Sequence, residues 1–356
     1  ESYSSLSELN LLPKLVVISL DISSEYLPDG FVFRRLWSFD VSIGMNSGWQ
    51  SLKSVLEICP ISRSLRINKS VDACKQLFEV VESLELGDVE GHPNLIPSLD
   101  LGFSKLTSLD LQRCHSMQCL VDALKQQVPI TALSNLRKLS LSHMFYLEEM
   151  CNAPQPQGFL QKLEEVEVSD CGEMRVLFPI AELRSIEQEG PSRHLTLQSL
   201  KIVKIRRCYN LKYIFPMSVA NSLGQLHTLM INHCSQLEDI IQDRQVAYKC
   251  LLQSLKIVKI ESCYKLKYIF PMSTANSLGQ LHTLKIESCR QLEDIIQDRQ
   301  VACKCLLQSL REVSLIHLPQ LKGRNVNDIM LAQSSLQKLK VDYCPQLTHF
   351  IVSTTI

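Results

Sequence analysis

The residues best suited to chemistry in this sequence are its fourteen cysteines. Thiolates bind soft metals, and neighbouring thiols can form disulfides, so a regular cysteine series raises both hypotheses. Cysteine side chains that point in the same direction in successive repeat units have poor geometry for a disulfide, however. A small, buried thiol suits a position that recurs in every unit. We therefore interpret the series as structural. Seven cysteines share this slot: Cys114, Cys171, Cys208, Cys234, Cys263, Cys289 and Cys344.

Other candidate ligands fail to recur in a near-identical sister segment 55 residues away. Cys303-x-Cys305 resembles a metal-ligand pair, but the sister segment has Tyr248 in place of Cys303. His227 is repeated as His282, whereas His233, next to Cys234, becomes Ser288. A metal set that is not reproduced is not favoured, so we predict no metal site.

Acidic pairs and catalytic motifs offer no stronger case. Glu238-Asp239 recurs as Glu293-Asp294 and could supply paired carboxylates, but a solvated loop is the preferred interpretation. The chain contains no phosphate-binding G-x-x-x-x-G-K-[ST], no G-x-S-x-G and no H-E-x-x-H. The sequence therefore predicts a binding scaffold and no enzyme.

Composition narrows the classes of partner. Of 356 residues, 45% are apolar and 21% charged, which is typical of a folded chain. Lys plus Arg and Asp plus Glu both number 37, so no net charge attracts nucleic acid or a membrane surface. No apolar run is long enough for a membrane helix. The start at Glu1, with no initiator Met or signal pattern, suggests a cut through a longer protein.

Internal repetition defines the architecture. Residues 197–251 recur as 252–306 with nine mismatches, which indicates a tandem duplication. Within each copy the spacing L-x-x-L-x-L-x-x-C-x-x-L occurs twice, first at Leu200, Val203, Ile205, Cys208 and Leu211. From Leu200 onward successive units start 26 or 29 residues apart, and further units extend the pattern from Leu15 to Leu347.

This spacing is the leucine-rich-repeat template with Cys in the N/C position. We predict an α/β solenoid with short parallel strands on the concave face and loops or short helical turns on the convex face. Repetition is needed because one unit cannot bury enough apolar surface, whereas stacked units share a core. We expect one continuous solenoid, irregular over residues 1–95 and regular over 96–356.

The nine mismatches between the two copies fall mainly on outward positions. Five lie at residues 206, 207, 230, 232 and 233 of the first copy, including the charge reversal from Arg206 to Glu261. Exposed positions tolerate change, which is one explanation. The segment 238–246, which is also expected to be exposed, is repeated unchanged as 293–301, however. This favours the interpretation that the outward sheet face changed in order to bind a different partner.

Longer phrases carry a family resemblance. Residues 211–218, Leu-Lys-Tyr-Ile-Phe-Pro-Met-Ser, and residues 223–241 resemble the C-terminal repeats of plant coiled-coil, nucleotide-binding, leucine-rich-repeat (NBS-LRR) disease resistance proteins. Residues 27–91 contain similar phrases. The resemblance implies a cytoplasmic plant-defence sensor that recognises a pathogen effector or a guarded host protein and restrains the receptor's own nucleotide-binding domain. ADP or ATP is expected only in such an upstream domain, because this chain has no P-loop.

If this resemblance holds, the partner contacts are expected on exposed residues of the duplicated strands. These are Lys204, Arg206, Arg207, Met230, Asn232, His233, Lys259, Glu261, Ser262, Lys285, Glu287 and Ser288. The alternative is the substrate-binding repeat domain of an F-box ubiquitin-ligase adaptor, whose repeats keep a uniform step and a helix in each turn. A secreted receptor is disfavoured, because it would carry Gly-x-Ile-Pro in each repeat.

Overall fold

The structure is a computed structural model in which most of the chain can be described. The described residues are 6–23, 36–44, 62–100, 102–122, 124, 128–129, 131–152, 158–178, 195–242, 252–297, 306–307, 309–322, 330–332, 335–347 and 351–353.

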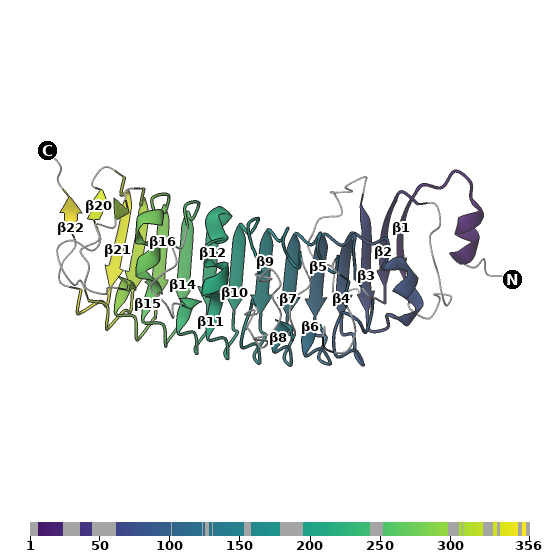
Figure 1. Cartoon of the computed structure of the whole chain (residues 1–356), viewed down its shortest axis with the longest axis horizontal. Coiled ribbons are helices and arrows are strands. Elements are labelled where there is room, and N and C mark those ends of the chain that lie inside the picture. Colours follow the sequence, from purple (N-terminus) through teal and green to yellow (C-terminus); the bar gives the residue numbers. More distant parts are fainter. Residues whose placement is uncertain are drawn as a thin grey trace, which may run out of the picture.

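In the described part of the chain, thirteen parallel strands form one continuous sheet (Figure 1). Each strand belongs to one turn of a solenoid, so the predicted leucine-rich-repeat fold is confirmed. In spatial order the strands are β1 (Val17–Ile22), β2 (Ser38–Ile43), β3 (Arg63–Asn68), β4 (Ser83–Gly87), β5 (Ser108–Gln112), β7 (Lys138–Ser142), β9 (Glu165–Ser169), β10 (Ile202–Arg206), β12 (Thr228–Asn232), β14 (Ile257–Glu261), β16 (Thr283–Glu287), β19 (Glu312–Ile316) and β21 (Lys338–Asp342).

Alternation along each strand explains this sheet. In β10, Val203 and Ile205 are buried, whereas Ile202, Lys204 and Arg206 lie on the outward face. The next strands repeat this pattern in register, with Val203 beside Leu229 and Ile205 beside Ile231. Successive side chains of a strand point to opposite faces, so one face of every strand enters the core and the other is offered to solvent.

Each main-sheet strand from β4 onward is followed directly by a residue with left-handed backbone geometry, which we call the corner residue. Its φ lies between 51° and 56°, although no corner residue is glycine. From Asp88 to His317 its amide donates to the next turn, as Arg207 does to the Asn232 carbonyl at 2.9 Å. This inter-turn bond offsets the steric cost of the left-handed conformation. The corner residues are Asp88, Arg113, His143, Asp170, Arg207, His233, Ser262, Ser288, His317 and Tyr343.

Short strands and helical turns complete the turns opposite the main sheet. Helical turns were predicted there, and the structure contains the four-residue α-helix α1 (Met217–Ala220) and 3₁₀ turns at Leu223–Gln225 and Met272–Ser277. Further 3₁₀ turns are Leu6–Leu11 and Asp72–Leu77.

The short strands were not predicted. They pair in parallel between neighbouring turns, and several line the lower edge of the array in Figure 1. They are β6 (Cys119–Val121), β8 (Glu149–Cys151), β11 (Tyr213–Pro216), β13 (Asp239–Gln242), β15 (Tyr268–Phe270), β17 (Asp294–Ile296), β18 (Leu306–Leu307), β20 (Met330–Ala332) and β22 (Ile351–Ser353).

The acidic pairs expected in solvated loops lie partly in these strands. Asp239 and Asp294 are the first residues of β13 and β17, so the loop interpretation was wrong for them. The Asp239 carboxylate accepts a hydrogen bond from the Tyr268 hydroxyl, and the next two residues, Ile240 and Ile241, are buried. Packing therefore accounts for the identity of residues 239–241 between the copies. That identity is no longer an argument that the outward sheet face changed for binding.

One apolar core connects the turns from Phe39 to Leu321. Phe178 and Phe215 stack at 5.5 Å between ring centroids, and so join the turn of β9 to the turn of β10. One mismatch of the duplication also lies in this core, because Val219 and Thr274 are both fully buried. The Thr274 hydroxyl donates to the Pro271 carbonyl at 2.8 Å, which satisfies the extra polar group.

None of the helices in the described part of the chain is long and apolar enough to cross a membrane.

Candidate interaction surface

Three columns of side chains cover the outward face of the main sheet. We name each column by its position in the five-residue strand, so β10 contributes Ile202 to the first column, Lys204 to the third column and Arg206 to the fifth column. Parallel pairing in register carries each column to the neighbouring strands, so Lys204 lies beside Glu167 on one side and Met230 on the other. Neighbouring strands are about 4.8 Å apart, so residues of one column act as a continuous row.

The twelve residues predicted from the duplication form one patch on β10, β12, β14 and β16, which we call the duplicated patch. The third column supplies Lys204, Met230, Lys259 and Lys285, and the fifth supplies Arg206, Asn232, Glu261 and Glu287. The remaining four, Arg207, His233, Ser262 and Ser288, are corner residues one position beyond each strand.

The corner residues differ from the expectation of exposed strand positions. His233 is exposed and Arg207 and Ser288 are half-buried, but Ser262 is only 7% exposed. The prediction of Ser262 as an exposed contact was therefore wrong. The left-handed corner turns the chain toward the core as it enters the buried Cys slot, so a short side chain there can be covered.

Ion pairs and hydrogen bonds fix some side chains of the duplicated patch in place. The Lys204 ammonium lies 3.2 Å from Glu165 and 3.3 Å from Glu167. The Asn232 amide donates to Glu261 at 2.7 Å. Partial burial opposes the charge on Lys204, but the hydrogen bonds and attraction of the two carboxylates outweigh it and raise its pKa.

The other charged side chains of the duplicated patch either share a partner or have none. Lys285 shares Glu312 with Lys338, at 3.0 and 2.9 Å, and the hydrogen bonds from Lys338 and Lys285 lower the pKa of Glu312. Within the described part of the chain, no ion pair or hydrogen bond engages the side chains of Arg206, Lys259 or Glu287. Such unpaired, solvated charges can be used by a partner without breaking an existing contact.

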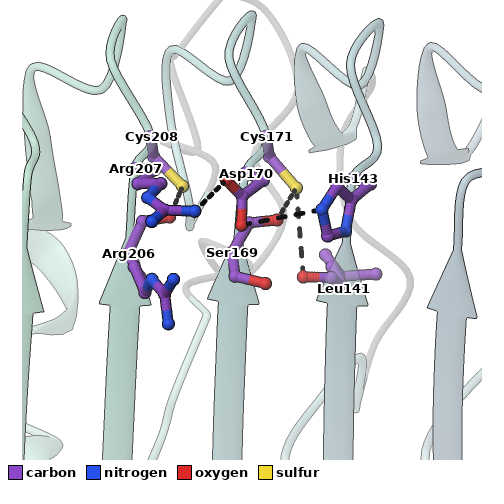
Figure 2. A network of polar contacts seen from close by, with 8 residues as sticks. All are labelled: Leu141, His143, Ser169, Asp170, Cys171, Arg206, Arg207 and Cys208. Atoms are coloured by element: carbon purple, nitrogen blue, oxygen red, sulfur yellow. Dashed lines mark hydrogen bonds and ion pairs between the residues drawn. The ribbon is translucent and has the colours of Figure 1, made fainter.

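Figure 2 shows how the corner residues extend this surface beyond β10. Asp170 lies between two other corner residues, with its carboxylate 3.3 Å from Arg207 Nη1 and 4.0 Å from His143 Nε2. Its amide donates to the Arg206 carbonyl at 2.9 Å. The corner residues thus form a second polar row beside the strand ends, with its charged members between Asp88 and Arg207.

The Cys slot lies directly beneath this row and is buried from Cys114 to Cys289. Each thiol donates to the carbonyl two residues earlier, as from Cys171 to Ser169 at 3.4 Å (Figure 2). A hydrogen bond with Cys171 and burial raise the pKa of Cys208, and burial raises that of Cys234. These are the contacts expected of structural thiols.

Among the described residues, no three His, Cys, Asp or Glu side chains come together as a metal-binding group. Cys303, Cys305 and Tyr248 lie outside the described residues.

The sequence did not suggest a further feature, a set of exposed aromatic side chains next to the Cys slot on several turns. Tyr209 and its copy Tyr264 follow Cys208 and Cys263 directly, and Arg290 lies 5.0 Å from the ring centroid of Tyr264. These side chains are Phe145, Tyr146, Tyr209, Tyr264 and, at a corner, Tyr343, on the separate turns of β7, β10, β14 and β21. The repeated Cys-Tyr pair was the available signal, since exposed aromatic residues are enriched at protein interfaces.

The stacked strands, buried ladder and Cys slot define the chain as a leucine-rich-repeat solenoid. The family model for the leucine-rich repeats of plant disease resistance proteins like RPS2 matches residues 54–188, 180–235 and 235–355. The chain therefore belongs to this family of plant disease resistance leucine-rich repeats. Such solenoids are typically non-catalytic protein-interaction domains.

A curated relative supports this assignment over a shorter stretch. The chain is 32% identical over 101 residues to the "Probable disease resistance protein At4g27220" of Arabidopsis thaliana. The match covers 27% of this chain and 11% of that protein.

Proposed function

We propose that this chain is the recognition region of a plant intracellular immune receptor and that the outward sheet face contacts the recognised protein. The partner is a pathogen effector or a host protein that an effector alters. The observation that carries this proposal is the duplicated patch, where most differences between the two copies gather on one face. The unpaired side chains of Arg206, Lys259 and Glu287 support it.

The proposal places the chain in the cytoplasm, next to the receptor's own nucleotide-binding domain, which it restrains until the partner binds. ADP or ATP would bind that domain and not these repeats. The family assignment and the match to a disease resistance protein support this part.

The F-box adaptor is not favoured. That alternative requires a helix in each turn, whereas the described part of the chain contains a single α-helix of four residues. Successive strands also start at unequal steps, for example at residues 202, 228 and 257.

The test uses the full chain as bait against a panel of purified candidate effectors, with binding measured by biolayer interferometry. The variant R206E/R207S gives the first copy the residues of the second copy at these positions. A genuine effector contact should weaken by about tenfold or more, because a charge reversal turns attraction into repulsion. The melting temperature of the variant should stay close to that of the parent chain.

The matched control is K212E/K267E, which alters two exposed lysines before β11 and β15, away from the sheet face. Effector binding that survives R206E/R207S but is lost in this control would place recognition elsewhere on the solenoid.

A further inference from the structure

From β4 onward, the charges of the third column change sign between β9 and β10, and in β3 the column holds Arg66 beside Glu85. From β4 to β9 its charged members are Glu85, Asp110 and Glu167. From β10 to β21 they are Lys204, Lys259, Lys285 and Lys340, with no acid among them. The reversal falls between the directly paired residues Glu167 and Lys204.

Within the second half, two lysines are placed side by side. Lys259 and Lys285 are direct partners in the β14–β16 pairing. Like charges opposite each other weaken a sheet, and among described residues only Lys285 of these two has an ion-pair partner, Glu312. The duplication therefore left an unfavourable cation pair at the centre of the duplicated patch, where the first copy has Lys204 beside Met230.

We infer that this lysine row binds an acidic helical segment of the partner protein. The inference rests on the proposed function, because it takes the sheet face as the recognition surface. Charge complementarity selects an acidic partner, and the same column from β4 to β9 is unsuited to it.

The spacing of the row selects a helix. Lys259 and Lys285 lie on adjacent strands, about 4.8 Å apart, and Lys204 and Lys340 each lie two strands further along, about 9.6 Å away. One and two turns of an α-helix laid across the strands span about 5.4 and 10.8 Å, so its stripe residues fall close to these lysines. An extended segment repeats on one face about every 6.8 Å and soon loses register. From β10 to β21 the row spans five strand intervals, or about 24 Å, the length of about 16 helical residues.

The neighbouring column limits which helix fits. Glu261 and Glu287 are direct partners in the fifth column and lie beside the lysine row. A helix with acids all around would be repelled there. The fitting segment has one acidic stripe, with neutral or basic residues on the flank that covers the fifth column.

The experiment measures fluorescence anisotropy of a labelled alanine-rich helical peptide, about 16 residues long, with a single glutamate stripe. A second peptide has the same composition but distributes its glutamates around the helix. The parent chain should bind the striped peptide more tightly. Replacing both lysines in K259E/K285E should weaken that binding by about tenfold or more, and K259Q/K285Q should give an intermediate loss. The control K212E/K267E makes the same charge change away from the sheet face and should bind like the parent.

Equal binding of the two peptides, or equal binding by K259E/K285E and the control, would overturn the inference. It would also be overturned by self-association of the chain that K259E/K285E abolishes, because the acidic half of a second copy would then occupy the row. These outcomes leave the proposed function standing, since its own test depends on effector binding and on Arg206 and Arg207.

Discussion

The Tyr268 hydroxyl donates a 2.6 Å hydrogen bond to the Asp239 carboxylate, and this contact crosses the boundary between the two copies of the duplication. Tyr268 begins β15 of the second copy and Asp239 begins β13 of the first. The copies are thus joined opposite the main sheet as well as through it.

Replacing Tyr268 with Phe removes this bond and keeps the ring. We expect the free energy of unfolding to fall by about 1–2 kcal/mol, because the bond is to a charged acceptor in a partly buried site. Thermal unfolding of Y268F measures this. Y264F is the control, since Tyr264 is exposed and no hydrogen bond of its hydroxyl is found in the described part of the chain. A loss of stability as large in Y264F would contradict the prediction.

Ser277 links two turns through a single hydroxyl. It accepts from the Leu252 amide at 3.0 Å and donates to the Thr274 carbonyl at 2.8 Å. S277A leaves a buried amide without its partner, so we expect a loss of about 1–3 kcal/mol in urea unfolding. S222A should behave alike, because Ser222 bonds Leu197 in the same way. S235A, at a half-buried serine without a hydrogen-bond partner among described residues, should change the midpoint little.

The buried thiols should resist alkylation in the folded protein. Burial raises the pKa of Cys114 to about 11, so only about one thousandth of it is thiolate at pH 8. Cys344 is less buried and should react with iodoacetamide first. Mass spectrometry after timed labelling separates the two sites. Labelling of Cys114 as fast as Cys344 in the native state would show that the slot opens readily.

Asp88 should contribute stability that depends on pH. Its carboxylate receives bonds from Arg113 Nε at 2.7 Å and Nη2 at 3.0 Å, and these lower its pKa. A pKa lowered on folding gives stability that is present above the unfolded-state value, about 4, and is lost as pH falls through the folded-state value. Both side chains are about one-third exposed, so the contribution is about 0.5–1 kcal/mol.

The measurement compares the parent with R113Q by urea unfolding between about pH 7 and pH 3. The two chains should differ at neutral pH and converge in acid. K75Q is the control, because its partner Asp72 is 76% exposed and the pair contributes less. A difference between the parent and R113Q that persists unchanged to the lowest pH would contradict the assignment.

The main sheet could be predicted because alternation is visible within each short strand. Val203 and Ile205 flank Lys204, and the same order recurs in every regular turn. The short strand β11 could not be found in this way. Ile214 and Phe215 are adjacent and both buried, and the strand ends at Pro216, so it shows no period of two.

The outward columns of the candidate surface followed from the same alternation, but the corners did not. Arg207, His233 and Ser262 are not residue types that favour left-handed geometry as glycine does. Their conformation follows from the bond of each amide to the next turn, which becomes visible only when the turns are stacked. The covered position of Ser262 has the same origin.

The unequal steps of the repeat determine how such a protein can change its length. Strands at residues 202, 228 and 257 begin two turns and the next copy, so one copy spans 257 − 202 = 55 residues. Inserting a 55-residue copy adds two strands, or about 10 Å of sheet. The added turns pack against their neighbours through the same side chains as the existing copies do. Unequal recombination between such copies can therefore lengthen or shorten the exposed face and still preserve the packing between neighbouring turns. One copy is then free to diverge in charge while the other keeps its residues.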